Sequence, residues 1–290
     1  ALQELDLSLS PLGQLGGRAV AALLAQCPAL ALQELDLSLS PLGQLGGRAV
    51  AALLARCPAL ALQELDLSLS PLGQLGGRAV AALLARCPAL VTLRLRGCGL
   101  SDAPAIPEGC ALRILCLSWN PLGPAGLRRL LRALAAPKLR SLELAGVSGA
   151  GADTGDTGDR GDTGDIGRDV AEGDTGDIGR DVAEYLMKAG CALCHLSLAG
   201  NHLRDEDIEE VARGLGRCPS LESLELSANP GLGSRSFRNL LEALEKRGRG
   251  LQRLGMAGCG IGAVDGDAWK RGRARISDLR LPGRRLWKGP

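Results

Sequence analysis

The stretch LRILCLSWNPLGPAGLRRLLRAL, residues 112–134, contains two hydrophobic periodicities in succession. Leu115 and Leu117 are two residues apart, which points both side chains to the same face of a short strand. The leucines at 127, 130, 131 and 134 then follow the i, i+3, i+4, i+7 spacing of an amphipathic helix. This stretch therefore predicts one strand followed by one helix, each with a single apolar face.

The same pattern recurs along nearly the whole chain. Residues 1–30, 31–60 and 61–90 are one 30-residue unit in three copies, which differ only where Gln26 is replaced by Arg56 and Arg86. Stacked units of strand and helix must curve, because a helix is wider than the spacing of about 4.8 Å between strands. The sequence therefore predicts an α/β leucine-rich-repeat solenoid, a horseshoe with parallel strands on the concave face and helices on the convex face. About ten repeats are expected, starting at Leu2, Leu32, Leu62, Leu90, Leu112, Leu139, Leu193, Leu221, Leu251 and Ile276.

A short polar residue follows the second strand leucine by three positions. It is an asparagine in some repeats, as at Asn120, Asn201 and Asn229, and a serine or cysteine in others, as at Ser10 and Cys98. A buried turn leaves backbone groups without strand partners. We therefore expect these side chains to bond the turn backbone from inside the arc.

The leucine pattern divides the chain into residues 1–147, of which 1–90 are the triplicated unit, and residues 182–290 with a basic C-terminus. Residues 148–181 between them are rich in Gly and Asp, and GDTGDIGRDVAE occurs twice in tandem, at 161–172 and 173–184. This tract has no apolar set with which to fold, so we predict a disordered insertion on the convex side, with the helix resuming near Val182. Residue 1 begins on a strand motif, and solenoids need capping repeats, so we expect the natural protein to continue upstream.

Composition excludes some classes of protein. Lys+Arg 34 against Asp+Glu 32 gives no overall charge that would direct the chain to nucleic acid or membrane. No uncharged apolar stretch reaches the roughly 18 residues of a membrane span. The chain has 10 cysteines and no signal peptide, which favours reduced thiols over a disulfide framework. We therefore expect an intracellular protein that makes no membrane contact.

Residues suited to catalysis or metal binding are sparse. Cys191 and Cys194 form C-x-x-C, but Leu193 between them is a strand leucine, and no second cysteine pair lies at zinc spacing. A packing role is therefore favoured for both thiols. His195 and His202 are the only histidines and have no nearby nucleophile, so neither supports a catalytic triad. The sequence predicts no enzymatic activity, no metal, no cofactor and no small-molecule ligand.

Horseshoe proteins commonly bind along their concave surface, so the strand residues between core leucines are the candidate contacts. The N-terminal end of this surface is acidic, with Glu4, Asp6 and their copies, the middle is nearly neutral, and the far end is basic. The candidate protein-binding residues are Glu64, Asp66, Arg94, Arg96, Cys116, Trp119, Glu143, His195, Ser197, Glu225, Arg253 and Arg280.

A basic C-terminal patch is a second candidate surface, formed by Lys270, Arg271, Arg273, Arg275, Arg284 and Arg285. Such a cluster suits phosphates or an acidic partner, and plain solvated surface is the alternative. The aromatic residues near it are Trp269 and Trp287, too few for a stacking platform, which weakens a nucleic-acid interpretation. Direct contact with nucleic acid stays open.

From about residue 85 to 290 the chain resembles the C-terminal leucine-rich repeats of the tonsoku-like protein family. The matching stretches are CALCHLSLAGNHL at 191–203, CPSLESLELSANP at 218–230 and LQRLGMAGCGI at 251–261. The unit at 1–30 looks like one repeat of the same family. Its triplication and the Gly/Asp tract depart from the family pattern, and the tetratricopeptide and ankyrin repeats that the family carries upstream are not in this sequence.

The resemblance implies a scaffold in the nucleus, at chromatin and replication forks, that supports DNA double-strand break repair by homologous recombination. It implies that the leucine-rich repeats hold the large partner subunit of the tonsoku-like repair complex and, indirectly, the strand-exchange recombinase. The alternative is an innate-immune or ribonuclease-inhibitor-type horseshoe that acts as a sensor or an inhibitor. Ankyrin repeats in the native upstream sequence would favour the scaffold, whereas a Walker-type nucleotide-binding loop would favour the sensor.

Overall fold

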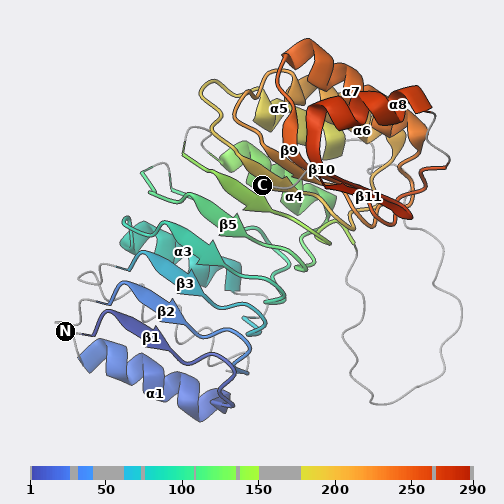
Figure 1. The fold of residues 1–290 in the computed structure, drawn as a ribbon. Helices are drawn as coiled ribbons and strands as arrows, with labels where there is room; N and C mark the ends of the chain where they lie inside the picture. The colour runs from blue at the N-terminus through green and yellow to red at the C-terminus, as the bar shows by residue number, and fades with distance from the viewer. Residues whose placement is uncertain are drawn as a thin grey trace, which may run out of the picture.

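The protein is described by a computed structural model over residues 2–26, 32–41, 62–72, 76–107, 109–134, 138–149, 178–262 and 266–287. The strands succeed one another in chain order, from the blue N-terminal end to the red C-terminal end in Figure 1. Helices accompany them on one side of the sheet (Figure 1). The predicted α/β leucine-rich-repeat solenoid is confirmed.

Ten parallel strands coincide with the ten predicted repeats. They are β1 Glu4–Asp6, β2 Glu34–Asp36, β3 Glu64–Asp66, β4 Thr92–Arg94, β5 Ile114–Cys116, β6 Ser141–Glu143, β7 His195–Ser197, β8 Ser223–Glu225, β9 Leu251–Gly255 and β10 Ile276–Leu281. The motif leucines are in register, with Leu115 opposite Leu142 and Leu142 opposite Leu196. Each repeat therefore adds one layer of leucine to a continuous core.

The C-terminal end departs from the predicted parallel pattern. We expected Leu286 to occupy the last leucine position of the tenth repeat, but it lies in a further strand, β11 Arg284–Trp287, which pairs antiparallel with β10. Gly283 has a φ of 65°, the left-handed conformation that glycine adopts without a steric penalty, and so permits the tight turn between them. The hairpin covers the edge of β10 that another repeat would otherwise pair with.

The helices are α1 Gly13–Gln26, α3 Gly76–Arg86, α4 Gly123–Ala133, α5 Ile178–Leu186, α6 Asp205–Leu215, α7 Ser234–Arg247 and α8 Gly266–Arg275. Their spacing buries one stripe against the sheet, as Leu127, Leu130 and Leu131 do in α4. The helix expected in the second copy of the unit lies outside the described residues. Where helices are described, the predicted apolar stripes are the buried ones.

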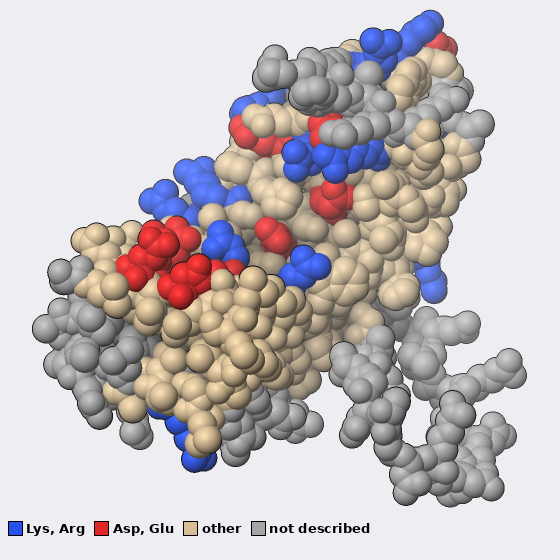
Figure 2. Space-filling view, turned by 60° about the horizontal axis from the view of Figure 1, so that its bottom comes forward, with Lys and Arg blue, Asp and Glu red and all other residues tan. Residues whose placement is uncertain are grey.

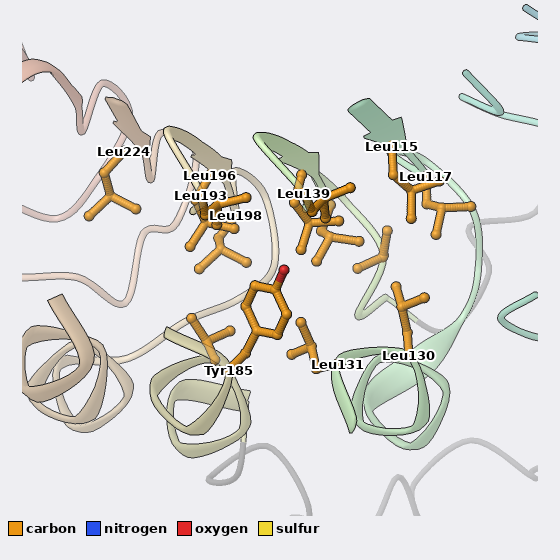
Figure 3. Close-up of a cluster of buried hydrophobic side chains, with 14 of the residues drawn as sticks. Leu115, Leu117, Leu130, Leu131, Leu139, Tyr185, Leu193, Leu196, Leu198 and Leu224 are labelled. Atoms are coloured by element: carbon orange, nitrogen blue, oxygen red, sulfur yellow. The ribbon is translucent and has the colours of Figure 1, made fainter. Parts of the chain in front are cut away.

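The core is tiled from leucines, with Tyr185 as its largest side chain. Figure 3 shows the Tyr185 ring between the helical layer and the strand leucines, close to Leu131 and Leu198. Its hydroxyl is buried without a hydrogen-bond partner, and burial raises the pKa of this phenol. Leu2 in the first repeat is 47% exposed, while its copies Leu32 and Leu62 are fully buried. A leucine layer is therefore buried only where a repeat lies on each side of it.

The predicted role of the turn asparagines is confirmed. The Asn229 side chain accepts hydrogen bonds from the backbone N–H groups of Asn201 and Leu203 and donates to the carbonyls of Leu198 and Leu226. Asn120 and Asn201 make equivalent bonds in their own repeats. Where the residue is shorter, as at Ser40 or Cys98, it still donates to a carbonyl of the preceding repeat. These side chains join adjacent repeats where the strand ladder ends.

The boundaries of the predicted insertion need correction. We expected residues 148–181 to lie outside the fold, but α5 begins at Ile178, and Ile178 and Asp181 are buried. The Asp181 carboxylate also accepts a bond of 3.0 Å from Arg128 in α4. On the other side, Ser148 bonds to Asn201. The remainder of the tract, residues 150–177, lies outside the described residues, so the prediction of disorder stays a prediction.

Lys188 ties the two sides of this tract together. Its ammonium donates to the carbonyl oxygens of Leu131, Arg132 and Leu134 at the C-terminal end of α4. A cation is favourable there because the last carbonyls of a helix are unpaired and carry partial negative charge. The bonds of Asp181 and Lys188 thus hold α5, which follows the Gly/Asp tract, against α4, which precedes it.

Candidate protein-docking surface

Two rows of side chains run along the concave face, because the residues on either side of the central strand leucine point away from the core. The strand register aligns the first row as Glu4, Glu34, Glu64, Thr92, Ile114, Ser141, His195, Ser223, Arg253 and Asp278. The same register aligns the second row as Asp6, Asp36, Asp66, Arg94, Cys116, Glu143, Ser197, Glu225, Gly255 and Arg280.

The N-terminal end of both rows is acidic, as predicted. Six carboxylates from β1 to β3 line a shallow hollow that Arg94 closes, and the red group in Figure 2 marks this end. The Asp6, Asp36 and Asp66 carboxylates each accept a 2.8 Å bond from the N–H of the serine two residues later. Glu64 forms an ion pair of 3.6 Å with Arg94. The surface therefore carries a strong local negative charge although the whole chain is almost neutral.

The middle of the face is less open than the sequence suggested. Cys116 and Ser197 do occupy the second row, but they are only 5% and 9% exposed, because their short side chains lie below those of their neighbours. They shape the floor of the face and offer little surface to a partner. Glu143 and Glu225 are half-buried, and the Glu225 carboxylate leans over Gly255 and accepts the N–H of Ser227.

His195 sits at the centre of the first row, between Glu143, Glu225 and Arg253. Desolvation is the main reason why its pKa lies below the ordinary value of 6.5; Arg253 lowers it further, and both glutamates raise it. Since the fold favours the neutral ring, we expect stability to be full above pH 6.5 and to fall as the pH drops below that value. A His195→Gln variant should lose less stability than wild type between pH 7 and pH 5 in urea denaturation. Equal losses in the two proteins would contradict the burial of a neutral ring.

The C-terminal end of the face is mixed rather than basic. Arg253 and Arg280 both lie within ion-pair distance of the Asp278 carboxylate, at 3.3 and 3.0 Å. Asp278 is 7% exposed, and it was not among the contacts predicted from the sequence. The sequence did contain a signal for it, because Asp278 lies two residues before Arg280 in the strand motif of the tenth repeat. The ion pair of Arg253 with Asp278 joins β9 to β10, so the charges of the two arginines are partly neutralised within the fold.

Large apolar side chains form a further row at the carboxyl ends of the strands. We call Leu9, Leu39, Leu69 and Trp119 the rim ridge; they are 73%, 47%, 47% and 53% exposed. Trp119 was a predicted contact, and the Arg96 guanidinium lies 6.0 Å from its ring centroid, within cation–π range. The three leucines were missed. Each lies between two serines and outside the leucine motif, and this position was the signal that its side chain does not belong to the core.

The predicted basic C-terminal patch is spread over two elements. Lys270, Arg271, Arg273 and Arg275 lie on α8 in the helical layer, and Arg284 and Arg285 lie on β11, where their side chains are outside the described part. Arg271 makes a two-bond contact with Glu245 in α7, at 2.6 and 2.9 Å. Lys270 and Arg273 are exposed. The concave rows and α8 are thus separate surfaces.

Cys191 of the C-x-x-C motif contacts the thiol of Cys218 in the next repeat and not that of Cys194. The Cys191 and Cys218 sulfurs are 3.5 Å apart, in a hydrogen bond that raises the pKa of Cys191 and lowers that of Cys218. Cys194 instead lies 3.9 Å from a guanidinium nitrogen of Arg140. Among the described residues, no group of three or more His, Cys, Asp or Glu side chains could hold a metal ion.

Comparison with known proteins finds similar sequences over nearly the whole chain. The chain is 38% identical to tonsoku-like protein of Mus musculus, 39% to that of Bos taurus and 33% to that of Danio rerio, over 97%, 98% and 99% of its length. The predicted resemblance to tonsoku-like proteins is confirmed. The similarity extends beyond residues 85–290 and includes the repeated units at the N-terminus. From the sequence alone, only the unit at 1–30 had been compared with one repeat of the family. The chain spans 15% to 16% of the length of these tonsoku-like proteins.

No family model matches the chain. Among solved structures, the chain is similar to one described as the Rad7 and Elc1 complex in yeast, with 17% identity, a TM-score of 0.47, and coverage of 97% of this chain and 69% of that one. No helix within the described ranges is both long and apolar enough to cross a membrane. The chain is a leucine-rich-repeat domain that is similar to part of the tonsoku-like proteins. Repeats of this kind present extended concave surfaces for binding proteins.

Proposed function

We propose that this chain is a non-enzymatic protein-interaction scaffold that acts in the nucleus, at chromatin and replication forks, in double-strand break repair by homologous recombination. The similarity to tonsoku-like proteins over at least 97% of the chain carries the proposal. Its partner is the large partner subunit of the tonsoku-like repair complex, and the strand-exchange recombinase is reached through that subunit.

The concave face is the proposed docking surface. It combines exposed charge of both signs with an aromatic side chain, Trp119, and partner-binding surfaces are enriched in such anchors. Its charge is graded from an acidic end, formed by the carboxylates of β1 to β3, to a mixed end, where Arg253 and Arg280 lie beside Asp278. A partner that complements this gradient binds in one orientation, since the reversed orientation places like charges together.

The test is capture of partners from nuclear extract by the full chain, compared with a variant in which Ser141→Arg and Glu143→Arg obstruct the concave face. Both positions are half-buried on β6 at the centre of the two rows. Charge swaps at Arg253 and Arg280 are less suitable, because they would place carboxylates beside the buried Asp278. Bound proteins are identified by mass spectrometry.

The matched control carries Asn239→Arg and Glu242→Arg on α7, in the helical layer. Wild type and this control should both capture the large repair subunit, and the β6 variant should not, while all three give the same circular dichroism spectrum. Recovery of ribonucleases or immune receptors, with no repair protein, would contradict the proposal. Equal capture by the β6 variant would move the docking site away from the concave face.

A further inference from the structure

The rim ridge is an exposed apolar surface that the fold itself does not require. Each of its residues occupies the same place in its repeat, directly before the Ser or Asn of the turn. In the other repeats described, this place is taken by small residues: Gly97, Gly146, Gly200, Ala228 and Gly258. Since small residues serve the same turn, the leucines and the tryptophan are not needed to form it.

The backbone at this place is left-handed, which disfavours a bulky side chain. Leu9, Leu39 and Leu69 have φ values of 56°, 53° and 59°, and Trp119 has 62°. Such a conformation costs a leucine about 1–2 kcal/mol relative to glycine. Each N–H bonds to a carbonyl of the next repeat, as that of Leu39 does to Ser68, so the conformation is fixed by the repeat stack. Side chains retained in an unfavourable conformation and in contact with solvent point to a role outside folding.

Leu69 and Trp119 each lean along the solenoid axis and cover the next repeat. A Cβ at Gly97 would lie 2.7 Å from the Leu69 side chain, and one at Gly146 would lie 2.6 Å from the Trp119 ring. The glycines therefore leave the space that these side chains fill. The result is an apolar strip along the carboxyl ends of the strands, from β1 to β5.

The acidic ends of the two concave rows run parallel to this strip. Glu4, Glu34, Glu64, Asp6, Asp36 and Asp66 contribute six carboxylates over three strands. Arg94 forms an ion pair with Glu64 at the far side of this group. In each of the first three repeats the apolar strip is three residues from the aspartate row and five from the glutamate row, as Leu39 is from Asp36 and Glu34.

We propose that these two strips together bind a basic protein segment in an extended conformation, in which Lys or Arg side chains alternate with apolar ones. Alternate side chains of an extended chain point in opposite directions. One set then reaches the carboxylates, and the other packs on the rim ridge. The inference deepens the proposed function, on which it rests, by naming the chemistry of the segment that docks at the N-terminal end of the concave face.

The dimensions fit a short segment. The apolar strip spans four strand spacings of about 4.8 Å from β1 to β5, or about 19 Å, which an extended chain covers in about six residues. The carboxylates lie along its first half, from β1 to β3. Nucleic acid and anionic lipid are unsuitable occupants, because both would bring negative charge to the carboxylates. A basic protein segment is the complementary partner.

The probe is a fluorescein-labelled eight-residue peptide of alternating arginine and leucine, titrated with the full chain and followed by fluorescence anisotropy. One variant removes charge without changing shape: Glu→Gln at positions 4, 34 and 64 and Asp→Asn at 6, 36 and 66, since asparagine still accepts the serine N–H. The other replaces Leu9→Gly, Leu39→Gly and Leu69→Gly, which the turn accepts. We expect each to weaken binding at least about tenfold, a loss that two or three buried leucines or several ion pairs readily produce.

Matched controls carry Glu206→Gln with Glu242→Gln, and Met187→Ser, all exposed in the helical layer; they should bind like wild type. A peptide with glutamate for arginine should not bind, and higher salt should weaken the arginine peptide. Equal binding by the glycine variant, or by the glutamate peptide, would overturn the proposal. If wild type captures the repair subunit but not the peptide, this inference fails alone; if it binds the peptide but captures no repair protein, the proposed function fails alone.

Discussion

Replacing Asn229 with alanine is expected to destabilise the protein by about 3 kcal/mol, because four buried backbone groups each lose a hydrogen bond, and only the Leu226 carbonyl keeps another, from the Cys259 thiol. These are the N–H groups of Asn201 and Leu203 and the carbonyls of Leu198 and Leu226. Asn229 is fully buried, so water does not reach these groups without opening the turn. The free energy of unfolding from urea denaturation measures the effect.

The chain itself supplies an intermediate variant. Cys98 and Cys259 occupy the same position in other repeats, and each donates to a carbonyl of the repeat before it. Asn229→Cys should therefore lose less stability than Asn229→Ala. An Asn239→Ala substitution on the surface of α7 is the control and should change stability by no more than about 0.5 kcal/mol. An alanine variant as stable as the wild type would show that the asparagine ladder does not join the repeats.

Replacing Gly179 with valine should cost about 4 kcal/mol, because helices α5 and α6 touch at this glycine. A Cβ at Gly179 would overlap the backbone carbonyl and Cα of Asp207, neither of which can rotate away. The Gly179 N–H also donates to the Asp207 carboxylate at 3.1 Å. Denaturation of the purified variant gives the loss in free energy.

This result also tests where the Gly/Asp tract ends. Gly179 falls inside the insertion that the sequence predicted at 148–181, where a substitution would be harmless. Gly262→Ala, at a glycine with open space around it, is the matched control and should be neutral. A neutral Gly179→Val would mean that α5 does not pack on α6 from Ile178 onward.

The repeat architecture could be predicted because it rests on local periodicity. Leu115 and Leu117, and their equivalents in every repeat, are spaced to fill one face, and the same spacing sets the strand register. The exceptions arose where the series of parallel strands ends in the described structure or is interrupted. Leu286 follows the leucine spacing but has no further parallel strand beyond β10 in the described structure, and so pairs antiparallel with Leu279. Ile178 belongs to a segment that also occurs at 166–172, so composition alone could not show that this copy is buried.

The candidate surface was predicted in position but not in exposure. Alternation placed Cys116 and Ser197 on the concave face correctly, yet taller neighbours cover them. Asp278 was missed because its pairing with Arg253 depends on register between two strands. Leu39 was missed because a leucine in a leucine-rich sequence is easily assigned to the core, whereas the left-handed turn exposes it.

Hydroxyl-radical footprinting of the full chain, alone and with its captured partner, tests the proposed docking surface most directly. Trp119 on the rim and Met187 at the end of α5 are both reactive and similarly exposed, at 53% and 48%. If partners dock on the concave side, oxidation of Trp119 should fall severalfold on binding while that of Met187 stays unchanged. Protection of Met187 with Trp119 still oxidised would place the partner on the helices and contradict the proposal.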